Sequence, residues 1–335
     1  MGRSLSALRR TSGIRRVGSA PRASSQGAYV SVADLVALEH AARGFGFLPR
    51  QPVHSLLSGR HGSKVRGRGL SFEELRRYLP GDDVRAIDWR VTARTGKPYV
   101  RVFTEEKDRS TLLVVDQRGS MFFGTRRVMK SVSAAEVAAL TAWRALAQGD
   151  RVGGLVLGDA DLDEARPQRS RAAVVGLLER VAARNAALRA DLPLPASETA
   201  MLDRALEAAA RLASHDALVV VVSDFAGHGT HTRDLLAGLA RRNDVLAVLV
   251  YDPFLLELPD AGDLVVSDGR LQVEIGFAQS RVRDGIVAFA RGYGRAILAW
   301  QQEIGVPVLP LSTAEETAPQ LRRLLGQMAA SGKRR

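Results

Sequence analysis

The sequence predicts a three-layer α/β domain with a mostly parallel, doubly wound sheet, preceded by a smaller α+β segment. The first observation is that short apolar runs alternate with amphipathic stretches after Arg109. The second is that runs such as "ALVVVVSD" (217–224) are apolar at consecutive positions, which is typical of parallel strands buried on both faces. The third is a length of 335 residues with 46% hydrophobic and 25% charged residues, enough for one large domain and a companion.

The N-terminal part predicts a helix followed by a small α+β segment. Residues 31–44 begin with Ser31, a favoured N-cap residue, and continue with apolar residues at helical spacing. Residues 53–110 contain short β-like pieces separated by Gly and Pro, with a helical turn expected in "FEELRRYL" (72–79) before Pro80-Gly81. We therefore expect residues 29–109 to form one compact segment packed on the larger domain.

The repeat after Arg109 predicts the elements of the larger domain in chain order. Strands are predicted at 111–116, 151–158, 217–224, 244–252 and 306–311, and helices at 128–147, 171–185, 200–213, 230–241, 280–304 and 315–330. "DLVVSDGRLQVEI" (263–275) predicts a hairpin excursion with Asp268-Gly269 as a type I′ turn. The domain should span residues 110–312, with a C-terminal helix and basic tail over 313–335.

The formal charge of +12 is concentrated at the ends of the chain. Residues 1–28 contain no acid, and the C-terminus is Lys333-Arg334-Arg335. The Arg- and Ser-rich start predicts a disordered basic tail without the apolar stretch of a secretory signal. The apolar runs are far shorter than the roughly 20 residues that span a bilayer, so we expect a cytoplasmic protein without a membrane span. The absence of cysteine excludes disulfides and thiolate metal sites.

Acidic residues end three of the predicted strands. Asp116 ends "TLLVVD", Asp224 ends "ALVVVVSD" and Asp252 ends "DVLAVLVYD". Because the carboxyl ends of parallel strands meet at one edge of a sheet, these side chains could face a common ligand. Acids at such junctions also cap helix N-termini, and this structural interpretation remains an alternative.

Two resemblances follow from these residues. Strand–Asp-x-x-x-Ser–helix followed by strand–Ser-Asp resembles the von Willebrand factor A-like fold and its metal-ion-dependent adhesion site. "YLPGDDVRAIDW" (78–89), the surrounding residues 67–116 and "VYDPFLLELPDAG" (250–262) resemble the bacterial family catalogued as domain of unknown function 58. The second resemblance covers roughly residues 31–312. It implies a non-enzymatic adaptor that works with a MoxR-type AAA+ ATPase in chaperone-like remodelling or maturation of a client protein.

The adhesion-site resemblance implies a set of ligands for Mg²⁺, which takes hard oxygen ligands. The matching positions in this sequence are Asp116, Ser120, Thr199 and Asp224. Arg118 departs from the pattern because it stands where a serine ligand is expected, and a guanidinium offers only donors and a positive charge. We expect Arg118 to pair with the two aspartates in place of the cation, so that the site is degenerate and no cofactor is needed, with Mg²⁺ as the alternative.

The same edge is the predicted partner-binding site. A guanidinium fork matches the two oxygens of a carboxylate, so Arg118 is expected to capture an Asp or Glu of the partner. The residues assigned to this site are Asp116, Arg118, Ser120, Asp224 and Asp252.

A mixed charge cluster marks the N-terminal segment. Its members are Glu73, Arg77, Tyr78, Asp82, Asp83, Arg85, Asp88, Trp89 and Arg94. The favoured interpretation is a salt-bridged network that fixes the segment to the main domain, and the alternative is a partner-docking surface.

Two other functions are weighed against the adaptor. Pro80-Gly81-Asp82 with Glu105-Glu106-Lys107 loosely matches the carboxylate and lysine pattern of metal-dependent nucleases and phosphoesterases, but the acid stands one residue late. Binding of nucleic acid through the basic tails is the remaining alternative, and the local distribution of charge disfavours it. No nucleophile elbow or zinc-binding histidine pair is present, so the sequence favours a protein that is not an enzyme.

Overall fold

The computed structural model of the chain describes residues 27–43, 70–105, 109–190, 199–213, 215–259, 263–267, 272–276 and 280–332. The predicted basic tails, 1–26 and 333–335, lie outside these residues, as does the predicted turn Asp268-Gly269. Within the described part, no helix is both long and apolar enough to cross a bilayer.

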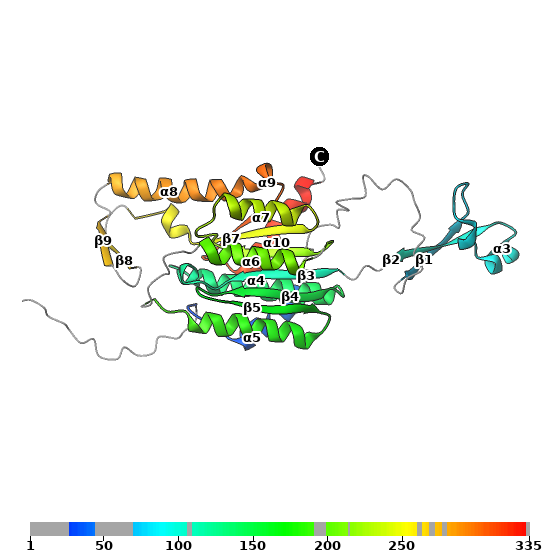
Figure 1. The fold of residues 1–335 in the computed structure, drawn as a ribbon, viewed down its shortest axis with the longest axis horizontal. Coiled ribbons are helices and arrows are strands. Elements are labelled where there is room, and N and C mark those ends of the chain that lie inside the picture. Colours follow the sequence, from blue (N-terminus) through cyan, green and yellow to red (C-terminus); the bar gives the residue numbers. More distant parts are fainter. Residues whose placement is uncertain are drawn as a thin grey trace, which may run out of the picture.

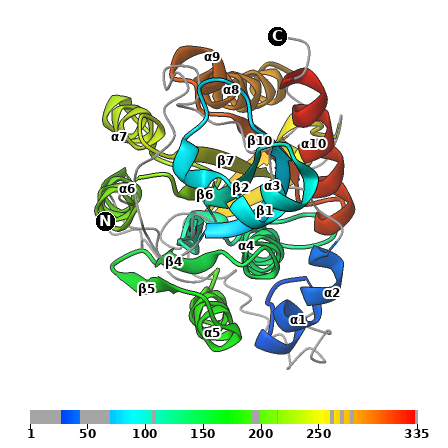
Figure 2. The ribbon, with the colours of Figure 1, turned by 90° about the vertical axis from the view of Figure 1, so that its right-hand side faces the viewer.

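The centre of the fold is a sheet of six described strands in the order β10-β7-β6-β3-β4-β5 (Figure 1 and Figure 2). The strands are β3 (Ser110–Asp116), β4 (Arg151–Leu157), β5 (Leu162–Gln168), β6 (Leu218–Ser223), β7 (Asp244–Tyr251) and β10 (Val308–Ser312). All neighbouring pairs are parallel except β4 with β5. From β3 the chain adds β4 and β5 on one side of the sheet and then β6, β7 and β10 on the other side. This is a doubly wound order, and its direction reverses between β3 and β6. The predicted von Willebrand A-like α/β class is thus confirmed.

Helices cover both faces of the sheet (Figure 2). One face packs against α4 (Lys130–Ala147), α5 (Arg171–Ala187) and α10 (Thr317–Gly332). The other packs against α6 (Thr199–Leu212), α7 (Thr230–Ala240), α8 (Ser280–Leu298) and α9 (Trp300–Glu303). Alternate residues of β3 serve the two cores, Leu113 and Val115 on the first face and Leu112 and Val114 on the second. Burial on both faces explains the continuous apolar runs in the sequence.

Strand β5 was not predicted from the sequence. It lies at the sheet edge, antiparallel to β4, and its residues alternate between half-buried and exposed. Its polar sequence "LDEARPQ" gives no apolar run, and Pro167 near its end fits an edge strand that needs no full set of ladder donors.

The N-terminal segment differs from its prediction at one element. Helices α1 (Val32–Ala37) and α2 (Glu39–Ala42) pack on α4 and α5 of the main domain, with Leu35 in its core. "FEELRRYL" contributes to strand β1 (Leu70–Arg77), not to a helical turn. Here pairing with β2 (Tyr99–Glu105) overrides the helical propensity of Glu, Leu and Arg.

The connection between β1 and β2 forms a small unit with them. It contains η1 (Val84–Ala86) and α3 (Trp89–Thr95), and Figure 1 shows this unit beyond one end of the sheet. The predicted hairpin is also present as β8 (Asp263–Ser267) paired antiparallel with β9 (Gln272–Gly276).

Candidate functional site

Three strands carry the candidate residues to one edge of the sheet. Asp116 is the last residue of β3, Asp224 follows β6 and Asp252 follows β7. The three strands are parallel neighbours, so their carboxyl ends lie side by side. We call Asp116, Arg118, Lys130 and Asp224 the strand-end cluster, because ion pairs join these four side chains.

Arg118 and Asp116 form a buried ion pair. Nε of Arg118 donates to Oδ1 of Asp116 at 3.0 Å, and Nη2 donates to Oδ2 at 2.7 Å. Nη1 donates to the carbonyl oxygen of Ala226 at 3.2 Å. The exposed fraction is 0% for Arg118 and 1% for Asp116. The fork of the guanidinium therefore binds a carboxylate of its own chain, in the bidentate geometry that such pairs favour.

The second carboxylate is held mainly by a lysine. Nζ of Lys130, the first residue of α4, lies 2.6 Å from Oδ2 of Asp224, whereas Nη2 of Arg118 is 4.0 Å from Oδ1. Burial alone would raise the pKa of Asp224. The charge and hydrogen bond of Lys130, the N–H of Ala226 and the charge of Arg118 outweigh burial, so this pKa lies below its ordinary value.

The loop after β6 is shaped around these contacts. Ser223 donates to Oδ2 of Asp116 at 2.5 Å and accepts from the N–H of Phe225 at 2.7 Å. Phe225 has φ 58, in the left-handed region that a non-glycine residue enters at a cost of about 1–2 kcal/mol. Its buried ring meets Trp300 edge to face, with ring centroids 5.1 Å apart. The ring contact and the hydrogen bonds of Ser223 thus offset the cost of the left-handed backbone at Phe225.

Asp252 has a separate structural role. It accepts from the hydroxyl and N–H of Thr125, from the hydroxyl of Thr313 and from the N–H of Phe254. Burial alone would raise the pKa of Asp252, but these hydrogen bonds lower it below its ordinary value. Asp252 joins the ends of β7 and β10 to the loop after β3 and caps η3 (Pro253–Leu256). It is not brought into contact with Arg118.

The remaining predicted residues have different placements. Ser120 lies beside Asp224, with 3.5 Å between Oγ and Oδ1. Thr199 begins α6, but its side chain lies outside the described residues. The predicted capture of a partner carboxylate by Arg118 needs correction, because this side chain is buried and its fork is occupied by Asp116.

Asp82, Asp83 and Asp88 make contacts within the β1–β2 unit. Asp82 pairs in bidentate fashion with Arg76, at 2.8 Å for both contacts, and accepts from the N–H of Leu79. Asp83 caps η1, and Asp88, which is 7% exposed, caps α3 through the N–H groups of its first turn. These contacts organise the connection, and none of them reaches the main domain.

Other members of the predicted charge cluster do not form a network. Arg77, Arg85 and Arg94 are exposed, and no ion pair joins them to a described residue. Tyr78 is half-buried, and the side chain of Glu73 lies outside the described residues. In the nuclease pattern Asp82 is bound by Arg76, and Glu106-Lys107 lies outside the described residues, so the nuclease alternative stays a prediction.

Sequence reasoning missed Lys130 and Arg76. Lys130 is 94 positions from the carboxylate that it binds. The only local signal was its place at the start of the helix that follows the Asp116 loop. Arg76 lies six positions before Asp82 and was hidden by the expectation of a helical turn, in which the two side chains would not meet.

Comparison with known proteins gives one family and several relatives. Residues 74–294 match the model of the family described as "Protein of unknown function DUF58". The chain is 32% identical over 277 residues to uncharacterized protein Mb1516 of Mycobacterium bovis, covering 82% of this chain and 85% of the relative. Uncharacterized protein Rv1480 of Mycobacterium tuberculosis matches with the same identity and coverage.

Solved structures resemble the chain at low sequence identity. An aerotolerance-related membrane protein from Bacteroides fragilis matches with 12% identity and a TM-score of 0.37, covering 66% of this chain and 100% of that one. The SpRpn10 VWA domain matches with 9% identity and a TM-score of 0.34, covering 64% and 93%.

Proposed function

The chain belongs to the DUF58 family, and from this premise we propose that it is a non-enzymatic adaptor that works with a MoxR-type AAA+ ATPase. In this proposal it helps to remodel or mature a client protein by binding partners through exposed side chains. The von Willebrand A-like fold suits a protein-interaction role. The proposal has two parts, a sheet edge that needs no metal ion and a docking surface on the β1–β2 unit.

The contacts at the sheet edge support independence from metal. Both oxygens of Asp116 accept from Arg118, and one oxygen of Asp224 accepts from Lys130. Two positive side chains therefore balance two carboxylates inside the cluster. A divalent cation would have to displace both and would lie beside their charges, so these residues do not suit Mg²⁺. In this proposal the site is degenerate, because Arg118 and Lys130 supply the positive charge that an ion supplies in the adhesion site that this edge resembles.

The observation that carries the docking surface is the exposure of Trp89. Its exposed fraction is 68%, and Leu79 and Val84 are 59% and 58% exposed in the same connection between β1 and β2. We call Leu79, Val84 and Trp89 the docking surface. Large apolar side chains that stay exposed mark protein contact sites when they gather in one region, and Trp is the residue type most enriched at binding hot spots.

The acids around this surface support the same interpretation. Asp82, Asp83 and Asp88 bind Arg76 and backbone N–H groups, which fixes the shape of the connection. A loop held in one conformation loses little conformational entropy when it binds. These three aspartates are thus the support of the docking surface.

The test is a titration of the immobilised full chain with the purified MoxR-type ATPase of the same organism. We expect Trp89→Ala to lower affinity by about 2 kcal/mol, or about 30-fold. The melting temperature should be unchanged because the ring is exposed. Lys97→Ala, an exposed change in the same unit, is the matched control and should bind as the unaltered chain does.

The same titration in EDTA tests the metal-free edge. We expect equal affinity with and without the chelator. Full affinity of the Trp89→Ala protein would refute the docking surface, loss of binding in EDTA would refute the metal-free edge, and absence of binding by the unaltered chain would refute the ATPase as partner.

A further inference from the structure

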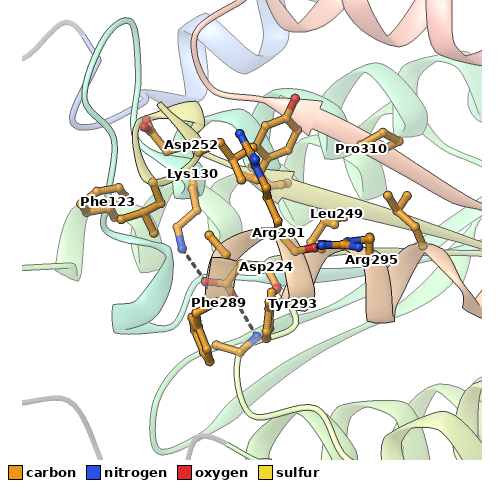
Figure 3. A pocket seen from close by; sticks show the side chains of 18 of the residues that line it. Phe123, Lys130, Asp224, Leu249, Asp252, Phe289, Arg291, Tyr293, Arg295 and Pro310 are labelled. Atoms are coloured by element: carbon orange, nitrogen blue, oxygen red, sulfur yellow. Dashed lines mark hydrogen bonds and ion pairs between the residues drawn. The ribbon is translucent and has the colours of Figure 1, made fainter. Parts of the chain in front are cut away.

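A cavity of about 700 Å³ lies between α8 and the ends of β7 and β10, with η3 along one side (Figure 3). Its volume is within the range of roughly 300–1,000 Å³ that is usual for small-molecule sites. It adjoins the strand-end cluster, because Lys130 and Asp224 form part of its wall. None of the functions considered above uses this cavity.

The walls of the cavity are mostly apolar. Its apolar side chains include Leu249, Leu255, Ile286, Phe289, Leu298 and Pro310. Three of them remain exposed to solvent, with exposed fractions of 74% for Phe289, 41% for Leu298 and 38% for Leu255. Covering such surface with an apolar ligand is favourable by roughly 25 cal/mol for each Å² removed from water. The cavity therefore suits a ligand with an apolar body.

Two arginines give the cavity an unbalanced positive charge. Arg291 and Arg295 line it from successive turns of α8. Nε of Arg295 donates to the carbonyl oxygen of Arg291 at 3.3 Å, and no carboxylate among the described residues pairs with either guanidinium. The two acids in the wall are already engaged, Asp224 by Lys130 and Asp252 by threonine hydroxyls and backbone N–H groups.

From this geometry we propose that the cavity binds a small anionic amphiphile. The apolar body lies along Ile286, Phe289 and the end of β7, and the carboxylate, sulfate or phosphate head lies between Arg291 and Arg295. A guanidinium offers paired donors to the oxygens of such a head. A cationic head would be repelled, and an uncharged head would leave both guanidinium charges without a negative charge beside them.

The probes are three molecules with one twelve-carbon chain and different heads. Dodecanoate, dodecanol and dodecylammonium are titrated into the full chain by calorimetry, below the concentrations at which they form micelles. Dodecanoate should bind at least about tenfold more tightly than the other two, since charge-assisted hydrogen bonds add to the burial of the chain. Vesicles that contain an anionic phospholipid separate a membrane surface from a free amphiphile as the source of the ligand.

Variants locate the site. Ala290→Trp fills the cavity and should weaken dodecanoate and dodecanol about tenfold or more, whereas Ala288→Trp, on the exposed side of α8, should change neither. Replacing both Arg291 and Arg295 by Gln should weaken dodecanoate alone, by about tenfold.

Each outcome of these titrations decides one point. A control with Gln at Arg241 and Arg281, two exposed arginines that do not line the cavity, should bind dodecanoate normally. Equal binding by the Ala290→Trp and Ala288→Trp proteins would overturn the assignment to this cavity. Equal affinity for dodecanoate and dodecylammonium would overturn the preference for anions. Binding to vesicles without binding of the free probes would overturn a small-molecule site.

Discussion

Removal of the guanidinium from the strand-end cluster should destabilise the domain strongly. In Arg118→Met the apolar stem is roughly kept, while Asp116 loses a bidentate partner at a site where it is 1% exposed. Breaking a buried ion pair by removal of one member costs about 3–5 kcal/mol, because the other charge stays buried without compensation. This is a large part of the 5–15 kcal/mol by which domains are usually stable, and it corresponds to a fall in melting temperature of roughly 6–20 °C.

The assay is urea unfolding followed by circular dichroism, with the free energy of unfolding taken from linear extrapolation. Arg211→Met, at an exposed position of α6, is the matched control and should change this free energy by less than about 0.5 kcal/mol. Adding Asp116→Asn to Arg118→Met should recover at least about 1 kcal/mol, since the uncompensated charge is removed. A loss below about 1 kcal/mol in Arg118→Met, or no recovery in the double variant, would show that the pair does not hold this edge together.

Three further predictions concern the strand-end cluster and the cap of α3. Arg118→Ser alone should gain little affinity for Mg²⁺, because Lys130 still lies 2.6 Å from Asp224. The double variant Arg118→Ser with Lys130→Ala should bind Mg²⁺ more tightly than Arg118→Ser when both are titrated by calorimetry. Equal affinities of the two proteins would show that Lys130 does not oppose the ion. The pKa of Asp224 is lower in the folded chain than its unfolded value of about 3.9, so its contribution to stability is present above that value and is lost as pH falls through the folded pKa. Lys130→Met should therefore flatten the acid side of the curve of unfolding free energy against pH, and an unchanged curve would contradict the assigned cause. Asp88→Ala should lower the free energy of unfolding by about 1 kcal/mol, because α3 loses its N-cap. The same loss should appear as faster hydrogen exchange at the N–H groups of Arg90 and Val91. A loss of about 3 kcal/mol would instead indicate a buried charge network.

The sequence was most informative where burial dictates residue type. Strands such as β6 are apolar at consecutive positions, from Leu218 to Val222, because both faces are covered, and this pattern marked their position and their parallel order. The positions of Asp116 and Asp224 at one edge then followed from the topology rule alone. β5 escaped because an edge strand with solvent on one side has no apolar run to mark it.

Partners at long range were less accessible to sequence reasoning. The sequence predicts that Arg118 pairs with both aspartates. In the structure Arg118 pairs mainly with Asp116, because Lys130 lies closer to Asp224 than Arg118 does. Nothing local distinguishes Lys130 from an ordinary first-turn lysine, because its role depends on how α4 packs beneath β3 and β6. The expectation that Arg118 captures a carboxylate of a partner was wrong because the side chain is buried, and the local sequence does not show this burial.

The carboxylates at this edge of the sheet are paired with side chains of the same chain. A bound divalent ion can leave, and a site that depends on it can be emptied by a chelator or completed by a partner's carboxylate. Arg118 and Lys130 are part of the chain, and parting Arg118 from Asp116 would cost about 3–5 kcal/mol, so the cluster stays assembled under ordinary conditions. The α8 cavity adjoins this cluster, because Lys130 and Asp224 form part of its wall and the hydroxyl of Tyr293 on α8 donates to the carbonyl oxygen of Asp224 at 2.9 Å. A ligand in the cavity would therefore meet the strand-end cluster directly, whereas the proposed docking surface lies on the β1–β2 unit.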